Sequence, residues 1–253
     1  MRNAGRRDAG RKYAARAILA CLVAMSATAL AAEKLNFKPG WNVFSHDQDI
    51  QFGKQSVPEV EKEFPVLNDA EITRYVGNLG KRLTGFAPGN IDYPWTFKVV
   101  NSQDINAFAL PGGFIYVNRG VLEAADHEAQ VAGVMAHEIG HVVMRHGTHQ
   151  ASVTLAPRLG LGILGGLLGD SGGMASQAVQ LIAEVGVTAM FLRNSRGAES
   201  QADEVGTYIL YHGGYDPYAM AQFFEIIATK YPQRTLEFFS DHPNPQNRIK
   251  KVD

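Results

Sequence analysis

The sequence has almost no cysteine, since Cys21 is the only one among 253 residues. A disulfide framework within the chain is therefore excluded. Cys21 also lies within an N-terminal segment that we expect to be removed, so the mature chain would contain no thiol. Such a chain fits an oxidising compartment without needing disulfides.

Long hydrophobic runs are missing as well. After residue 31 no segment has about 18 uninterrupted apolar residues, so we expect no transmembrane helix there. The one earlier apolar run, AILACLVAMSATAL, follows a basic stretch and ends in small residues at Ala31. It is too short to span a bilayer, which favours a secretory signal peptide over residues 1–31 rather than a membrane anchor. A lipid on Cys21 is disfavoured because only four residues separate it from Arg16.

An excess of positive charge is also lacking. The segment 1–31 carries six basic residues and one acid, which leaves 18 basic and 24 acidic residues in the remainder. A net charge near −6 excludes the electrostatic footprint of a nucleic-acid-binding protein. We therefore expect an exported protein with no nucleic-acid partner, placed in the periplasm or at the outer membrane.

Apolar spacing and turn residues predict an α+β fold, mostly helical with one small sheet, in a single domain over residues 32–253. Asn68 is the expected N-cap of the second helix, with Glu71 completing a capping box. Helices are expected over residues 44–64, 68–83, 126–146, 195–211 and 217–231, and strands over 95–100 and 106–118, the latter a hairpin folded at Pro111, Gly112 and Gly113.

The stretch HEIGH lies in the helix expected to end at Gly147. At about 100° per residue, His137 and His141 point in nearly the same direction, so both imidazoles can bind one metal ion. Glu138 lies beside them, where it can hold a water molecule. His146 falls about 180° from His137 and His149 lies past the expected helix end, so neither is expected to join the pair.

A catalytic zinc site usually needs a third protein ligand. The stretch SRGAESQADEVG offers Glu199, with Asp203 one turn later on the same helix face. Glu199 would bind the metal, and Asp203 would accept the second ring N–H of a ligating histidine. Taken alone, this pair favours a solvated acidic face, and the HEIGH helix is what favours the metal site instead.

Three motifs, HEIGH, SRGAESQADEVG and SDHPNPQNRI, follow one another in this order, and INAFALPGGFIYVNRGVL precedes them. Together they resemble the integral HtpX-type and periplasmic BepA/LoiP-type zinc metallopeptidases, gluzincins that are grouped with the CAAX prenyl proteases. The resemblance implies a zincin-type domain with one zinc ion per chain. The departures, no transmembrane helices and no following helical repeats, imply a stand-alone member.

The resemblance also implies roles for individual residues. His242 matches a family histidine near the metal, and two roles stay open for it: an oxyanion donor, or a fourth zinc ligand at rest. The implied zinc ligands are His137, His141 and Glu199, the implied catalytic base is Glu138, and Asp203 is implied to orient a ligating histidine.

We therefore expect a zinc endopeptidase that hydrolyses peptide bonds in unfolded or misassembled envelope proteins, with a water activated by zinc and Glu138. The alternative is a non-catalytic, chaperone-like zinc-binding assembly factor. Extended substrate is expected to pair with the strand that contains Asn106, Ala107, Phe108 and Ala109.

The glycine-rich apolar segment 151–187 is expected to form a lid or a connector between the two metal-binding helices. Residues 155–190 could alternatively contact a membrane surface peripherally. The oligomeric state and the cleavage specificity are not determined by the sequence.

Overall fold

The computed structural model describes residues 37–242, except for residues 90, 155–194, 232 and 234–241. The expected signal peptide and nearly all of the segment 151–187 lie outside the described residues. Among the residues that are described, no helix is both long enough and apolar enough to cross a membrane.

The architecture confirms the expected α+β class, with helices around one small mixed sheet. In chain order the described elements are α2 (His46–Glu63), α3 (Ala70–Thr84), β1 (Thr96–Val100), β2 (Ala107–Leu110), β3 (Phe114–Asn118), α4 (Arg119–Ala124), α5 (Glu128–Val143), α8 (Arg196–His212) and α9 (Tyr218–Lys230).

The sheet has the strand order β1-β3-β2, with β1 parallel and β2 antiparallel to β3. The expected hairpin is confirmed. Its turn places Gly112 and Gly113 at φ values of 79° and 98°, where residues with a side chain are strained. Because β3 lies between β1 and β2, strand β2 is an edge of the three-stranded sheet.

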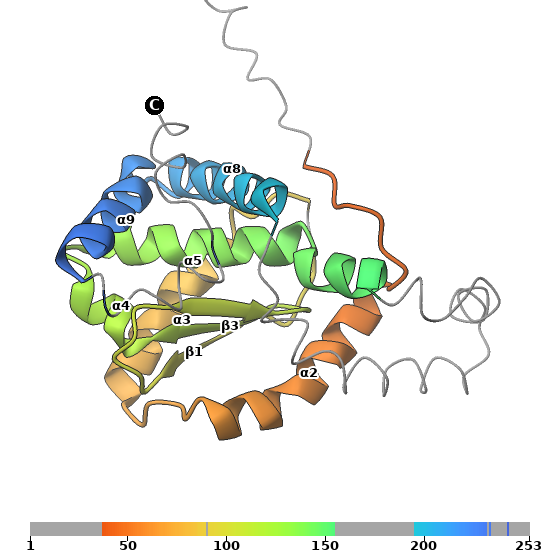
Figure 1. The fold of residues 1–253 in the computed structure, drawn as a ribbon, viewed down its shortest axis with the longest axis horizontal. Helices are drawn as coiled ribbons and strands as arrows, with labels where there is room; N and C mark the ends of the chain where they lie inside the picture. The colour runs from red at the N-terminus through yellow and green to blue at the C-terminus, as the bar shows by residue number, and fades with distance from the viewer. Residues whose placement is uncertain (1–36, 90, 155–194, 232, 234–241, 243–253) are drawn as a thin grey trace, which may run out of the picture. The chain divides into compact units, whose positions relative to one another are not determined.

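Helix α5 runs between the sheet and the helices α8 and α9 (Figure 1). One side faces the sheet, where α5 packs on β2, and α8 and α9 pack on its other side. Every side chain from Gln130 to Val143 is buried, as expected for a helix covered on all sides. The helix that contains HEIGH is thus buried along almost its whole length.

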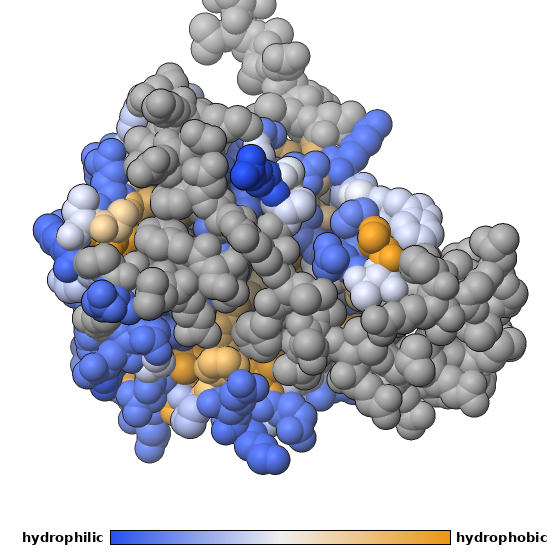
Figure 2. Space-filling model, in the orientation of Figure 1, coloured by the Kyte–Doolittle hydropathy of each residue, from blue (hydrophilic) through white to orange (hydrophobic). Residues whose placement is uncertain are grey.

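The described surface is largely hydrophilic on the face drawn in Figure 2, where hydrophobic residues show as small separate areas. The large hydrophobic side chains that are exposed in the described part of the chain are Trp41, Tyr75, Phe86, Val153, Tyr211 and Tyr218.

The expected helices begin and end within about three residues of the predicted positions, and two of the differences have a clear cause. The N-cap of α3 is Asp69 and not Asn68, because the Asp69 carboxylate accepts hydrogen bonds from the backbone N–H groups of Glu71 and Ile72. Helix α5 ends at Val143 rather than near His146. Arg145 adopts a φ of 56°, a left-handed conformation that breaks the helix.

Candidate metal centre

Helices α5 and α8 cross in close contact because glycines stand where they meet. A Cβ atom on Gly140 would lie 2.7 Å from the carbonyl oxygen of Ala202, and one on Gly206 would lie 3.2 Å from the backbone nitrogen of His137. Any side chain at Gly140 would push the two backbones apart. The glycine inside HEIGH therefore lets α8 bring its acidic residues against the histidines of α5.

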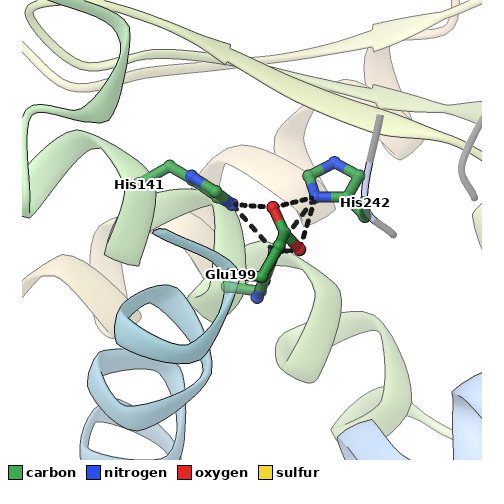
Figure 3. A group of neighbouring side chains, drawn as sticks. His141, Glu199 and His242 are labelled. Atoms are coloured by element: carbon green, nitrogen blue, oxygen red, sulfur yellow. Dashed lines mark hydrogen bonds and ion pairs between the residues drawn. The ribbon is translucent and has the colours of Figure 1, made fainter. Parts of the chain in front are cut away.

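Four buried side chains meet at this crossing: His137 and His141 from α5, Glu199 from α8, and His242 from the C-terminal part of the chain. One ligand atom from each lies within 4.8 Å of all the others. Figure 3 shows the Glu199 carboxylate between the rings of His141 and His242. Among the described residues this is the group of His, Cys, Asp and Glu side chains that could hold a metal ion.

The ring nitrogens that face this centre lie close together. Nε2 of His137 is 3.0 Å from Nε2 of His141 and 3.2 Å from Nδ1 of His242. The Glu199 oxygens lie 3.5 Å from Nε2 of His137 and 3.3 Å from Nε2 of His141. On the far side of the His137 ring, Nδ1 contacts Oδ1 of Asp203 at 3.0 Å.

Glu138 is buried beside these donors without being one of them. Its Oε1 atom lies 3.5 Å from Nε2 of His242, while Nδ1 of the same ring faces Glu199 at 3.2 Å. The His242 ring therefore lies between the carboxylates of Glu138 and Glu199. The structure brings together every residue that the motifs had singled out around HEIGH.

A family model described as Peptidase family M48 matches residues 70–253, a span that contains all four donors. This chain belongs to peptidase family M48. The metallopeptidase family expected from the motifs is thereby confirmed.

Several proteins resemble this M48 chain over most of its length. It is 32% identical over 216 residues to the beta-barrel assembly-enhancing protease of Escherichia coli, covering 82% of this chain and 44% of that protein. It is 31% identical over 179 residues to the metalloprotease LoiP of Escherichia coli, covering 68% of each. It is 30% identical over 183 residues to the mitochondrial metalloendopeptidase OMA1 of Schizosaccharomyces pombe, covering 72% of this chain and 52% of that protein. The chain thus spans less than half of the first of these relatives.

The protonation states in this M48 site suit metal binding. Burial lowers the pKa of His141 well below its ordinary value, against the opposing effect of its hydrogen bond with Glu199. Burial alone would raise the pKa of Glu199, but His242 and hydrogen bonds from His137 and His141 hold it below its ordinary value. A neutral His141 and an ionised Glu199 are the forms that bind a cation.

His146 was not expected to join the two metal-binding histidines, and it is not among the four donors. Its contact with His141, however, was not expected. Its buried ring lies against His141, with the two Nδ1 atoms 2.9 Å apart. The argument assumed a continuous helix, whereas the chain breaks at Arg145 and returns to helix over residues 146–154. His149 lies elsewhere, against the carbonyl oxygen of Trp41. No local signal in the sequence announces a left-handed arginine, so periodicity alone misses this contact.

The residues expected to bind substrate lie along the edge strand β2 and just before it. The N–H of Asn118 donates to the carbonyl oxygen of Asn106, which fixes the alternation of the antiparallel ladder. The backbone N–H and C=O groups of Phe108 then point towards β3, and those of Ala107 and Ala109 point away from it. The N–H of Ala107 is used by the Asn106 side chain, which accepts its hydrogen bond. Ala109 presents both its N–H and its C=O at the edge of the sheet.

Proposed function

We propose that this chain is a zinc-dependent endopeptidase that cleaves extended segments of unfolded or misassembled proteins in the bacterial cell envelope. The observation that carries the proposal is the buried cluster of His137, His141 and Glu199 with Glu138 beside it, within a chain of peptidase family M48.

The spacing of the donors supports zinc as the metal. In a tetrahedral site with metal–ligand bonds of about 2.0–2.1 Å, neighbouring donor atoms lie about 3.3 Å apart. The donor atoms of His137, His141, Glu199 and His242 are separated by 3.0–3.5 Å along the contacts that join them. Nitrogen and carboxylate donors without thiolates match the ligands of catalytic zinc sites.

When bound, zinc supplies a Lewis acid that polarises the scissile carbonyl and makes a water molecule acidic near neutral pH. The protein residues handle the proton. Glu138 follows His137 in the chain and its carboxylate is buried, so it can accept the proton of the attacking water and return it to the leaving amine.

His242 occupies the position of a fourth donor, with Nδ1 at 3.2 Å from both Glu199 oxygens. In this arrangement its ring also lies between the carboxylates of Glu138 and Glu199, where a water would need to bind. We therefore assign the described state to a closed, resting site. Turning the His242 ring away would open the fourth position to a water molecule.

We propose that the substrate binds along the edge of β2. Its outward N–H and C=O groups at Ala109 can pair with an extended peptide without reading side chains, which suits unfolded chains of many sequences. Strand β2 packs on α5, so a peptide paired there runs close to HEIGH. A folded protein presents few free strands, and the edge would therefore select unfolded segments.

The envelope location rests on the expected signal peptide and on a likeness to the beta-barrel assembly-enhancing protease of Escherichia coli. A chaperone-like assembly factor without catalysis is the weaker candidate. A site that only holds metal for structure has no use for a buried carboxylate such as Glu138 next to its donors.

The proposal is tested by comparing Glu138→Gln with Glu199→Ala in the purified mature protein. Glu138→Gln should keep its zinc and lose roughly a hundredfold or more in casein hydrolysis, because it removes only the base. Glu199→Ala should lose zinc as well as activity. The exposed Glu225 on α9 provides a matched control, and Glu225→Gln should behave as wild type. Full activity of Glu138→Gln would refute the proposed mechanism.

A further inference from the structure

The contact between His141 and His146 exists because the helix is interrupted at Arg145. On a continuous helix, the residue five positions after His141 would point about 140° away from it. Instead the two ring centroids are 4.9 Å apart and the rings meet edge to face. The left-handed conformation of Arg145 turns the following helical segment so that the His146 side chain returns to the metal centre.

A buried ion pair holds Arg145 in this conformation. Its guanidinium donates to both oxygens of Asp49, with Nε to Oδ2 at 2.6 Å and Nη2 to Oδ1 at 3.0 Å, and also to the carbonyl oxygen of Phe44. The hydroxyl of Tyr93 donates to the same carboxylate at 2.7 Å. A bidentate buried pair of this kind offsets the strain of a non-glycine residue at positive φ. The ion pair between Arg145 and Asp49 therefore stabilises the break after α5.

The hydrogen bonds of His146 have a direction. Its Nε2 atom lies 3.0 Å from Oε1 of Gln201, an oxygen that can only accept, so Nε2 carries the proton. In a neutral imidazole the other nitrogen, Nδ1, is then an acceptor. It lies 2.9 Å from Nδ1 of His141, which must donate. When a cation takes the lone pair of Nε2, which otherwise faces Glu199 at 3.3 Å, His141 carries its proton on Nδ1 and donates it to His146.

We propose that His146, oriented by Gln201, is a positioning residue that fixes the ring and the tautomer of His141 for metal binding. The proposal rests on the metal site of the proposed function and deepens it. Asp203 orients the His137 ring in the same way, because its Oδ1 lies 3.0 Å from Nδ1 of His137. The two ligating histidines are thus supported differently, one by a carboxylate and the other by a neutral imidazole and amide.

Two substitutions separate hydrogen bonding from packing. His146→Leu keeps a buried apolar volume and removes the acceptor, whereas His146→Gln keeps a side-chain oxygen that can accept from His141. Partners that orient a ligating histidine typically change metal affinity by roughly 10- to 100-fold. We expect His146→Leu to lose zinc affinity in that range, measured by competition with a chromophoric chelator. We expect His146→Gln to stay within about threefold of wild type.

A third measurement needs no variant. Nitrogen-15 spectra of the histidine rings in the zinc-loaded wild-type protein report which nitrogen of His146 carries the proton. We expect the Nε2–H form, and the Nδ1–H form would overturn the proposal even if the variants failed to fold. Wild-type affinity in a folded His146→Leu protein, or an equal loss in both variants, would also overturn it. If wild type itself bound no zinc, the proposed function would fail. Normal zinc binding together with the Nδ1–H form of His146 would refute the positioning role alone.

Discussion

Nδ1 of His137 lies 3.0 Å from Oδ1 of Asp203, a contact between residues 66 positions apart in the chain. Both side chains are buried, and Asp203 stands one turn after Glu199 on α8. A single helix face thus supplies one donor to the metal centre and one support to a histidine of that centre. The E-x-x-x-D spacing has a physical meaning only because α8 crosses α5 at this place.

Removing that support should weaken metal binding without removing a ligand. Asp203→Ala is expected to lower zinc affinity by roughly 10- to 100-fold, because the His137 ring loses the acceptor that fixes its orientation and tautomer. Chelator competition on the folded protein measures the change. Asp47→Ala, at an exposed carboxylate on α2, is the matched control and should bind zinc normally. Normal affinity in Asp203→Ala would show that the contact does not support the ligand.

The close crossing of α5 and α8 should tolerate no side chain at Gly140. A Cβ there would meet the Ala202 carbonyl oxygen at 2.7 Å, so Gly140→Ala must displace α8 and with it Glu199. We expect a loss of about 1–3 kcal/mol in unfolding free energy together with weaker zinc binding. Gly77→Ala is the control, because a Cβ on that helical glycine meets nothing within 4 Å and should be neutral or stabilising.

His242→Ala should raise the basal hydrolysis of a small unstructured peptide several-fold, because it removes the side chain that closes the fourth donor position. Zinc should still bind through the three remaining donors. Steady-state kinetics at saturating zinc measure the effect. A fall of about a hundredfold with unchanged zinc content would instead identify His242 as an essential oxyanion donor in the open state.

The substrate edge is tested at Ala109, whose N–H points away from β3. Ala109→Pro removes this donor while leaving the ladder to β3 intact, since proline is tolerated where the N–H faces outward at an edge. We expect KM for an extended peptide to rise at least several-fold with zinc content unchanged. Ala109→Val keeps the N–H and is the comparison that separates backbone pairing from side-chain bulk. Equal effects of the two substitutions would argue against peptide pairing at this edge.

Stability at alkaline pH should depend on Tyr116. Burial, with a hydrogen bond from its hydroxyl to Oε1 of Glu61 at 2.9 Å, raises the pKa of this phenol above its ordinary value. The unfolded chain then loses the phenolic proton near pH 10 while the folded chain keeps it, so the stabilising contribution is complete below pH 10 and declines above it.

Urea unfolding at pH 8 and pH 11 checks this sign. Wild type should lose stability between the two values, and Tyr116→Phe should lose less because it has no proton to release. At pH 8 the free energy of unfolding of the variant should be lower by about 1 kcal/mol, the usual net effect of one hydrogen bond. An identical pH dependence in both proteins would contradict the assignment.

Much of the site follows from local periodicity. The four-residue spacing of His137 and His141, the same spacing of Glu199 and Asp203, and the hairpin between β2 and β3 depend on backbone geometry within a few residues. Such features can be read from a sequence because each helical turn or tight turn repeats the same dihedral angles wherever it occurs. The α+β class and the order of the elements were predictable for the same reason.

The sequence by itself therefore determined which residues are candidates for the metal site and which helices present them. Only the tertiary structure decided how those helices meet. The contact of Gly140 with Ala202, the arrival of His242 beside Glu199 and the pairing of Arg145 with Asp49 join residues that are far apart in the chain. Periodicity carries no information on such pairs, because their energies come from packing and buried charge between elements. His146 illustrates the difference: its phase on an ideal helix points away from the site, and a distant carboxylate turns it back.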